Sequence, residues 1–463
     1  MAKIAIIGAG SLTFTARLVA DILTFETLRD AHFALVDTDA ERLGFAKQIV
    51  QRILSEGGYD KASFSASAER RDVLAGCDYV IISILVGGYE AIAPEIDIPM
   101  KYGVDQCIGD TLNAGGIMRC MRTLPVLAGI ATDVMDLCPD AQVLNYTNPM
   151  SMLCGGTVRA VPEVKLVGLC HSVQHTTHQW AERLGEEFDD IQWKCAGINH
   201  QAWLYEYRKG DEDLLPRIRQ LAVNPEIWLG DTVRMEMVKH FGYPVTESSG
   251  HGSEYTPWWR KRPELIEQYC PGGSWNGEHG FIKKLYSRTD WKERMGQLAN
   301  GEKPIDLGRS MEFGSYILNA CEGGDTVTIH GNVPNNGLID NLPAGSCVEV
   351  PVLVDADGLH PQPVGALPQV LAAINRTQIS VQELAVEAAL QKDPEILFQA
   401  MAMDPLTGAV LTLDEIRAMT AELIEAHRFC LPGWEDKSLE IKPVLVGTKA
   451  DAVEKHVDPG EGR

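Results

Sequence analysis

The chain begins with an apolar run that breaks into glycines, Met1-Ala-Lys-Ile-Ala-Ile-Ile-Gly-Ala-Gly-Ser11. This pattern predicts a β-strand, a tight turn and then a helix. Gly8 permits the turn and Gly10 lets the backbone approach a phosphate, while Ser11 and Leu12 begin the helix. The free N–H groups and positive dipole end of a helix N-terminus attract a pyrophosphate. The sequence therefore predicts that these four residues contact a dinucleotide.

A second apolar run, residues 31–36, ends at Asp37. A carboxylate at this position can accept hydrogen bonds from ribose hydroxyls and would repel a 2′-phosphate, which favours NAD over NADP. The glycine fingerprint is incomplete, because Thr13 stands where a third small residue is expected. A glycine turn without a cofactor is therefore the alternative.

The charge balance excludes several classes of partner. With 41 basic and 64 acidic residues the net charge is −23, which argues against nucleic acid and anionic membranes as ligands. No run reaches the roughly 18 apolar residues that span a bilayer, and glycines interrupt the N-terminal apolar stretch, unlike a secretory signal. Eleven cysteines without a regular spacing suit a reducing compartment, so we expect a cytoplasmic protein with free thiols.

Strand-like and helical segments alternate along the first part of the chain. The strand-like runs are 3–8, 31–37, 78–84, 141–147 and 164–170, and the helical ones are about 12–24, 40–56, 121–137 and 174–184. This alternation predicts an α/β fold with a Rossmann-type, doubly wound parallel sheet over residues 1–190. We expect a mixed α+β catalytic and oligomerisation domain over 191–463, with amphipathic helices at about 380–428, as in lactate and malate dehydrogenases.

Cys170 and His200 each follow a strand-like run, 164–169 and 194–198. The two side chains would then meet at one edge of a sheet and could hold a transition metal with open coordination positions for a substrate. The alternative for Cys170 is a small buried apolar side chain.

Several longer segments are more specific in combination than any one of them. They are Gly8-Ala-Gly-Ser11, Gly87-Gly-Tyr-Glu90, Asp110-Thr-Leu-Asn-Ala-Gly-Gly-Ile-Met-Arg119, Asn145-Tyr-Thr-Asn-Pro-Met150, Gly168-Leu-Cys-His-Ser-Val-Gln174, Ala196-Gly-Ile-Asn-His200, Thr246-Glu-Ser-Ser249, Glu254-Tyr-Thr-Pro-Trp258 and Gly337-Leu-Ile-Asp-Asn-Leu-Pro343. Across nearly the whole chain they resemble the NAD- and metal-dependent glycoside hydrolases of family 4, and within that family the members that cleave α-galactosides.

The resemblance implies an unusual route to glycoside cleavage. Hydride transfer from sugar C3 to NAD makes a ketone, which acidifies the hydrogen on C2. A base removes that hydrogen while a metal stabilises the enediolate, and the glycosidic oxygen on C1 leaves. Water then adds, and the returning hydride regenerates NAD.

The resemblance also implies roles for residues. Cys170 and His200 would bind Mn²⁺, with sugar O2 and O3 completing its shell, and Tyr255 would be the base at C2. A tyrosine base needs a lowered pKa, which a nearby cation could supply. The alternative for Tyr255 is packing beside Trp258.

Three further residues, Asn148, Glu90 and Arg119, would bind the sugar. The alternative for Asn148 is a purely structural role in a turn, because Asn-Pro commonly begins turns.

The proton donor for the leaving group stays open. Relatives that act on 6-phosphorylated glucosides have an acidic or amide residue directly after the metal-binding cysteine, whereas this chain has His171. His171 and Asp110 are the candidates, since an imidazole titrates in the useful range. Asp110 could instead cap the helix that follows Gly115.

Several alternatives remain at this stage. Members of the same family that cleave α-galacturonides or α-glucosides differ by few residues. Without the later segments, a plain NAD-dependent 2-hydroxy acid or sugar dehydrogenase would fit, and an inactive cofactor-bound sensor is a third class. The resemblance suggests a homodimer or homotetramer, although packing within one chain explains the same helix periodicity.

Overall fold

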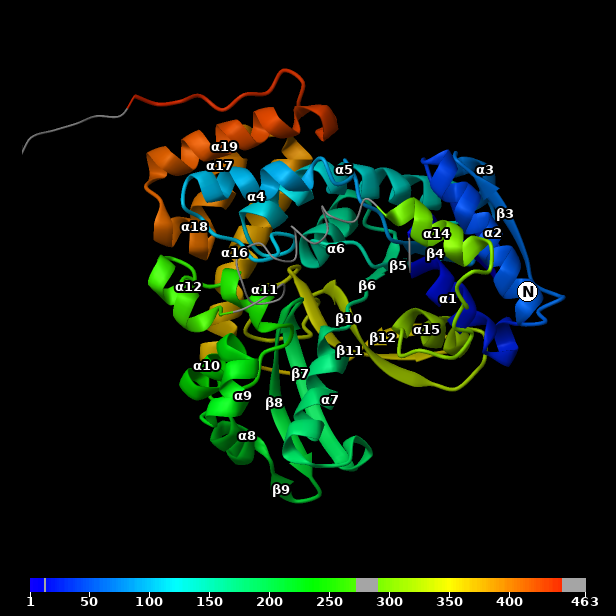
Figure 1. Ribbon diagram of the computed structural model, residues 1–463, viewed down its shortest axis with the longest axis horizontal. Coiled ribbons are helices and arrows are strands. Elements are labelled where there is room, and N and C mark those ends of the chain that lie inside the picture. The colour runs from blue at the N-terminus through cyan, green and yellow to red at the C-terminus, as the bar shows by residue number, and fades with distance from the viewer. Residues whose placement is uncertain (12–13, 272–289, 444–463) are drawn as a thin grey trace, which may run out of the picture.

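A single mixed β-sheet runs through the protein, shown in Figure 1 for a computed structural model that describes residues 1–11, 14–271 and 290–443. Its strand order is β3-β2-β1-β4-β5-β6-β10-β11-β7-β8-β9, with β12 paired to β11. The strands are β1 Lys3–Ile7, β2 His32–Val36, β3 Ser63–Ser67, β4 Tyr79–Ile82, β5 Gln142–Asn145, β6 Lys165–Gly168, β7 Ile191–Ile198, β8 Gln201–Lys209, β9 Glu212–Asp213, β10 Val327–Pro334, β11 Cys347–Asp355 and β12 Gly358–Pro361.

The first six strands are parallel and form a doubly wound half-sheet. Its central strands β1 and β4 are largely apolar and buried because helices cover both faces. In β1, Ile4 and Ile6 belong to the core on one face, and Ala5 and Ile7 to the core on the other. Beyond β6 in the strand order, each strand from β10 to β9 pairs antiparallel with its neighbours.

The helices of the first half cross between parallel strands or follow them. They are α1 Phe14–Leu23, α2 Ala40–Glu56, α3 Arg71–Leu74, α4 Ile92–Lys101, α5 Ala114–Leu137, α6 Met150–Ala160 and α7 Ser172–Leu184. The later helices surround the antiparallel strands and the far end of the sheet. They are α8 Leu215–Leu221, α9 Pro225–Gly230, α10 Thr232–Phe241, α11 Ser249–Glu254, α12 Pro263–Tyr269, α14 Trp291–Ala299, α15 Phe313–Cys321, α16 Gln369–Gln391, α17 Pro394–Met403, α18 Pro405–Val410 and α19 Leu413–His427.

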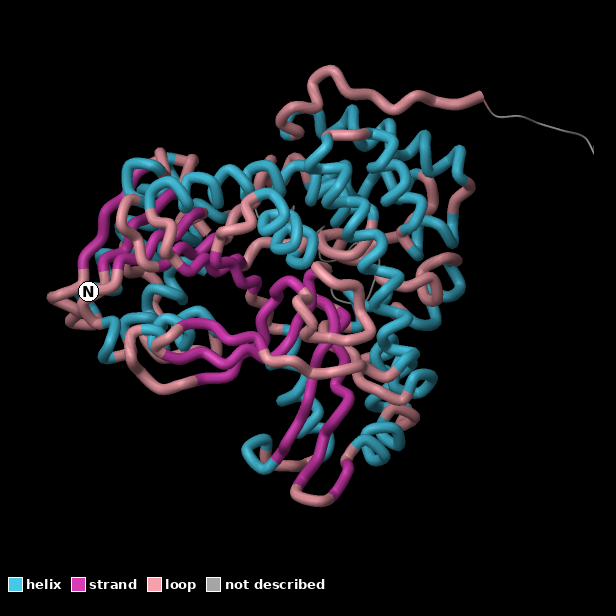
Figure 2. The backbone as a smooth tube through the Cα atoms, turned by 180° about the vertical axis from the view of Figure 1, so that it is seen from behind, coloured by secondary structure: helices cyan, strands magenta, loops and turns pink. Residues whose placement is uncertain are grey.

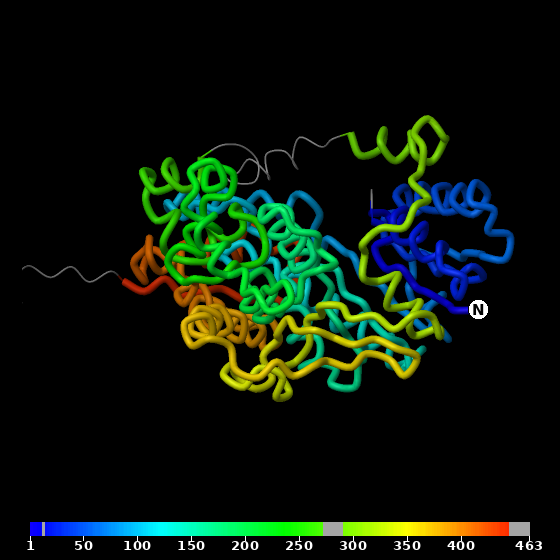
Figure 3. The backbone as a smooth tube through the Cα atoms, turned by 90° about the horizontal axis from the view of Figure 1, so that it is seen from below, coloured from blue at the N-terminus to red at the C-terminus, as the bar shows by residue number. Residues whose placement is uncertain are grey.

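The two ends of the described chain lie far apart. Figure 3 shows the N-terminal strands and helices at one end of the molecule and helices α16–α19 at the other. The strands in Figure 2 pass between these two groups of helices. The sheet thus connects the half that is built on parallel strands with the half that contains helices α16–α19.

The predicted α/β architecture is confirmed, with local differences. The five predicted strands are present, but β3, α4 and α6 were missed, because their sequences show weak or mixed periodicity. Helix α5 begins at Ala114 rather than near 121, and α7 at Ser172 rather than 174. Leu12 and Thr13 lie outside the described residues. The division at residue 190 stays a prediction.

Two bulk predictions can be compared directly with the structure. All eleven cysteines are free thiols, as expected. Within the described ranges, no helix combines the length and apolar character required to cross a membrane.

Gly8 offers a test of the first turn. It has a φ of 89°, and an added Cβ would lie 1.9 Å from the carbonyl oxygen of Ser83. We expect Gly8→Ala to lower the free energy of unfolding by at least about 2 kcal/mol in urea titrations followed by circular dichroism. Gly44→Ala is the control, because it lies within α2 with nothing within 4 Å of the new Cβ, and it should gain about 0.5–1 kcal/mol. Equal stabilities for the two variants would contradict this account.

Candidate active site

The structure brings Cys170 and His200 together and places a third candidate metal ligand, Glu247, beside them. One ligand atom from each residue lies within 4.8 Å of the other two. Thiolate, imidazole and carboxylate together suit a first-row transition metal. Sequence analysis missed Glu247 because it assigned no role within the Thr246-Glu-Ser-Ser249 segment. His200 and Glu247 are two of three described non-glycine residues with positive φ, 62° and 73°, and such strain concentrates at functional sites.

The order of the strands explains how Cys170 and His200 meet. Cys170 follows β6, and His200 lies in the turn between β7 and β8. Strands β10 and β11 lie between β6 and β7, so that Asn332 is opposite Gly168 and Glu349 is opposite Gly197. The two metal-ligand candidates are therefore held at one edge of a continuous sheet, as predicted.

His251 is a central residue that sequence analysis did not identify. Its Nδ1 lies 3.0 Å from Glu247 Oε1, its Nε2 lies 3.8 Å from Asp110 Oδ1, and its ring meets the His200 ring edge-on at 4.9 Å. Burial alone would lower the pKa of His251, but the charge and hydrogen bond of Glu247 raise it overall. Burial would raise the pKa of Glu247, but His251 and His200 lower it overall. Glu247 and His251 thus each favour the charged form of the other.

Asp110 belongs to the same group. It lies 3.7 Å from the Arg119 guanidinium, which also lies 3.4 Å from Glu95. Burial would raise the pKa of Asp110, but the charges of His251, Arg119 and His200 lower it overall. The suggestion that Asp110 caps α5 is wrong, because Asn113 is the cap and accepts a 2.8 Å hydrogen bond from Gly116 N.

Tyr255 faces the metal-ligand candidates. Its hydroxyl lies 2.9 Å from His200 Nδ1, and its side chain is buried. Its ring contacts among the described residues are with His200 and His251, whereas Trp258 contacts Phe241 and Trp259. Burial and the charges of neighbouring carboxylates raise the pKa of Tyr255 well above its ordinary value. The protein groups around Tyr255 therefore favour its protonated form, and a cation would have to oppose them.

Glu254 joins the segments that carry Tyr255 and Asp110. Its carboxylate accepts hydrogen bonds from the backbone N–H groups of Cys107, Ile108 and Gly109, at 2.6, 3.0 and 3.0 Å. Glu254 is fully buried at the end of α11, one residue before Tyr255, and Asp110 follows Gly109 directly. This buried carboxylate therefore sets the position of Asp110 relative to Tyr255.

The other predicted site residues differ in how close they come to this group. His171 Nε2 lies 2.6 Å from Glu312 Oε1, and this hydrogen bond raises the pKa of His171 despite burial. Asn148 Oδ1 is buried and has no hydrogen-bond partner among the described residues. Glu90 is exposed after β4, and no described hydrogen bond or ion pair connects it with the metal-ligand candidates.

The predicted cofactor residues form a tight turn at the end of β1. Gly10 N donates a 2.7 Å hydrogen bond to Asp37 Oδ2, and Ser11 N donates to Gly8 O. A Cβ on Gly10 would lie 2.4 Å from Arg42 Cβ and 2.6 Å from Asp37 Oδ2. Gly8, Gly10, Ser11 and Asp37 are thus adjacent, and Leu12 lies outside the described residues.

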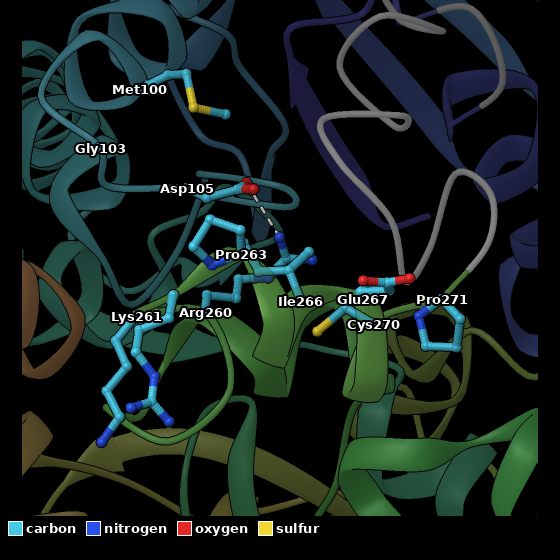
Figure 4. A pocket seen from close by; sticks show the side chains of 11 residues that line it. Met100, Gly103, Asp105, Arg260, Lys261, Pro263, Ile266, Glu267, Cys270 and Pro271 are labelled. Atoms are coloured by element: carbon cyan, nitrogen blue, oxygen red, sulfur yellow. Dashed lines mark hydrogen bonds and ion pairs between the residues drawn. The ribbon is translucent and has the colours of Figure 1, made fainter.

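A cavity of 890 Å³ lies between the C-terminal end of α4 and helix α12. Figure 4 shows Arg260 pointing toward Asp105, with Ile266 and Cys270 on the α12 side. None of the three metal-ligand candidates is among its described lining residues.

Comparisons with known proteins assign the chain to a family. A sequence model of family 4 glycosyl hydrolases matches residues 3–186, and a model of the C-terminal domain of that family matches residues 195–407. The chain belongs to family 4 of the glycosyl hydrolases. It is 40% identical over 440 residues to the α-galactosidase of Rhizobium meliloti, covering 93% of this chain and 89% of that protein. It is also 40% identical to the α-galactosidase of Bacillus subtilis, covering 94% of this chain and 100% of that protein.

Solved structures agree with this fold. A candidate glucosidase from Bacillus subtilis has a TM-score of 0.82 and 28% identity, covering 91% of this chain and 99% of that one. The 6-phospho-β-glucosidase of Thermotoga maritima, crystallised with manganese, NAD⁺ and glucose-6-phosphate, has a TM-score of 0.74 at 20% identity and covers 93% and 99%. A malate dehydrogenase from Naegleria fowleri has a TM-score of 0.51 at 12% identity and covers 84% and 98%, as expected for the dehydrogenase-like fold.

The burial of Glu254 leads to a stability test. Burial raises its pKa from 4.5 to about 7, so the folded protein binds this proton more tightly than the unfolded chain. That contribution is fully present below about pH 4.5 and is lost as the pH rises through 7. Relative to Glu254→Gln, the unmodified protein should therefore lose about 3 kcal/mol of unfolding free energy between about pH 4.5 and pH 8.

Urea titrations across this pH range measure the difference between the two proteins. The same substitution at exposed Glu387 is the control and should leave the pH dependence unchanged. A pH-independent difference between the unmodified protein and Glu254→Gln would contradict the assignment.

Proposed function

We propose that the protein is an α-galactosidase. The observation that carries the proposal is the group Cys170, His200, Glu247 and Tyr255, of which His200 and Tyr255 are buried, in a chain 40% identical to two α-galactosidases over most of its length. The substrate assignment comes from those relatives, and the chemistry from the side chains that meet at the sheet edge.

NAD and Mn²⁺ fit the two ends of the proposed site. The thiol, imidazole and carboxylate donors can hold a divalent first-row metal such as Mn²⁺. The tight glycine turn after β1, with Asp37 beside it, lies where folds of this type hold the pyrophosphate of a dinucleotide. When bound, NAD would accept and return a hydride at the sugar, and Mn²⁺ would act as a Lewis acid beside the carbon that loses a proton. Cys170, His200 and Glu247 would hold the metal, and Gly8, Gly10, Ser11, Leu12 and Asp37 the cofactor.

His200 orients the proposed base. If Nε2, which faces Glu247 at 3.7 Å, is the ligand atom, Nδ1 must carry the hydrogen and donate it to the Tyr255 oxygen 2.9 Å away. A hydrogen bond donated to that oxygen favours the phenolate and points one of its lone pairs at the sugar. Tyr255 would then accept the proton from sugar C2.

His171 is the better candidate for the leaving-group acid. Its hydrogen bond with Glu312 raises its pKa, which favours the protonated form that a general acid needs. Asp110 is held ionised by His251 and Arg119, which suits the fixing of a cation or a sugar hydroxyl rather than proton donation. Asn148 Oδ1, buried without a partner, is available to accept a hydrogen bond from a sugar hydroxyl.

Further predictions from the sequence remain proposals. Cleavage of α-galacturonides or α-glucosides is the alternative substrate choice, and Glu90 and Arg119 are proposed sugar contacts. Membership of glycosyl hydrolase family 4 argues against the other alternative, a plain dehydrogenase. Assembly as a homodimer or homotetramer and a cytoplasmic location also remain predictions.

Cleavage of an aryl α-galactoside by dialysed protein tests the proposal. Under reducing conditions, with NAD and Mn²⁺ restored together, we expect cleavage without net formation of NADH. Omission of either should abolish it, because the hydride acceptor and the Lewis acid act in one sequence. Failure to cleave the galactoside, glucoside and galacturonide, together with steady NAD reduction by a free sugar or hydroxy acid, would instead establish the dehydrogenase.

The proposed role of Glu247 as a metal ligand can be tested by measuring Mn²⁺ binding. Glu247→Gln keeps the shape of the side chain but removes its negative charge, and should weaken Mn²⁺ binding by about tenfold to 100-fold, measured from free Mn²⁺ by electron paramagnetic resonance. Glu312→Gln is the matched control, because Glu312 contacts His171 outside the cluster, and it should bind Mn²⁺ normally. An unchanged affinity in Glu247→Gln would exclude it as a ligand.

A further inference from the structure

Helix α16 has a row of three buried amide side chains. Asn375, Gln378 and Gln382 are 0%, 1% and 3% exposed. They follow one another by three and four positions, which places them on the same side of the helix. Burying an amide costs free energy unless it is hydrogen-bonded, so we expect contacts that use these side chains.

Gln378 holds the backbone of Tyr255. Its Nε2 donates a 2.5 Å hydrogen bond to the carbonyl oxygen of Tyr255. Tyr255 is the C-cap residue of α11, and the last carbonyl groups of a helix have no partner within that helix. Helix α11 has only six residues, too few to be stable without tertiary contacts. The amide of Gln378 therefore fixes the end of this short helix to the 23-residue helix α16.

Asn375 makes a similar contact beside His200. Its Nδ2 donates a 2.8 Å hydrogen bond to the carbonyl oxygen of Gln201 and lies 3.2 Å from Gln201 Oε1. Gln201 directly follows His200, which has a φ of 62°. A non-glycine residue keeps such a backbone conformation only where the surrounding contacts hold it. Asn375 supplies one of these contacts.

The two amides thus reach both partners of one hydrogen bond. His200 Nδ1 and the Tyr255 hydroxyl lie 2.9 Å apart, although the two residues belong to separate segments. Figure 1 shows α16 beside α11, the helix that ends at Tyr255. Because Asn375 and Gln378 are neighbours on one helix, their spacing sets the distance between the backbone groups that they hold.

We propose that Asn375 and Gln378 are positioning residues for the proposed base Tyr255. The inference rests on the proposed function, because it takes Tyr255 to accept the proton from sugar C2. Proton transfer requires the donor and the acceptor to lie within hydrogen-bond reach, so a small shift of the Tyr255 backbone slows this step. Both residues act through backbone carbonyl groups, so substrate binding depends on them much less than the proton transfer does.

Gln378→Met tests this role, because methionine is close to glutamine in length and volume but cannot donate a hydrogen bond. On an aryl α-galactoside with NAD and Mn²⁺, we expect kcat to fall about tenfold to 100-fold with little change in KM. Deuterium at sugar C2 should slow the variant by a larger factor than it slows the unmodified protein, because removal of that hydrogen has become slower. Deuterium at C3 should not have a larger effect. Asn375→Leu should change the C2 effect in the same direction.

Gln382→Met is the matched control. It makes the same substitution one turn further along the same face of α16, and Gln382 Nε2 has no hydrogen-bond partner among the described residues. It should keep kcat and both isotope effects. Gln378→Asn serves if the methionine variant does not fold, because it keeps a polar side chain that is one methylene too short to reach Tyr255. It should show the larger C2 effect as well.

Two results would overturn the inference and leave the α-galactosidase proposal intact. One is an unchanged kcat in the Gln378 variants. The other is a lower kcat with unchanged isotope effects, because a purely structural loss reduces the amount of active protein without altering which step is slow. If the unmodified protein cleaves no α-galactoside with NAD and Mn²⁺ present, the proposed function fails, and the inference fails with it.

Discussion

The insertion of β10 and β11 between β6 and β7 is the constraint on which the candidate site depends. It makes one continuous sheet out of two parts of the chain that would otherwise be separate, and so brings Cys170 to His200. Packing is tight at both paired residues: a Cβ on Gly168 would lie 2.5 Å from Met150 Sδ of α6 and 3.0 Å from Asn332 Cβ of β10, and one on Gly197 would lie 2.8 Å from Ala202 Cα of β8. Glycine at these two positions therefore permits α6 and β10 to pack closely on β6, and β8 on β7.

Electrostatics then organise the interior of the site. Burying a charge without a partner costs several kcal/mol, and here Glu247 pairs with His251 while Asp110 lies between His251 and Arg119. The exception is Glu254, which is stabilised by three backbone N–H groups instead of a directly paired cation. The network leaves Tyr255 among carboxylates that raise its pKa, so the positive charge that would activate it has to come from outside the chain.

The sequence predicted those parts of the site that follow strongly patterned elements. Cys170 and His200 could be predicted because each follows an apolar strand, and Gly8 and Asp37 because the first two strands are continuous runs of apolar residues. Glu247, His251 and Glu254 come from a six-residue helix and the loop before it, too short to show a period. The sequence could not predict that β10 pairs with β6 and β11 with β7, since a local pattern specifies a strand but not its distant partners.

Helix α7 is joined directly to the candidate metal site. It begins two residues after Cys170, with His171 at its N-cap, and the residues that line a polar cavity beside Glu247 lie on one of its faces. Because each residue turns a helix by about 100°, the direction of that face is fixed by the position of the metal-ligand candidate itself. A single residue inserted between Cys170 and Ser172 would rotate the cavity wall away from Glu247 while leaving the sheet intact. Within this fold, the direction of this α7 face and the position of Cys170 therefore cannot vary independently, and the side chains of the face can be changed without moving the metal-ligand candidate only by substitutions that keep the register of α7.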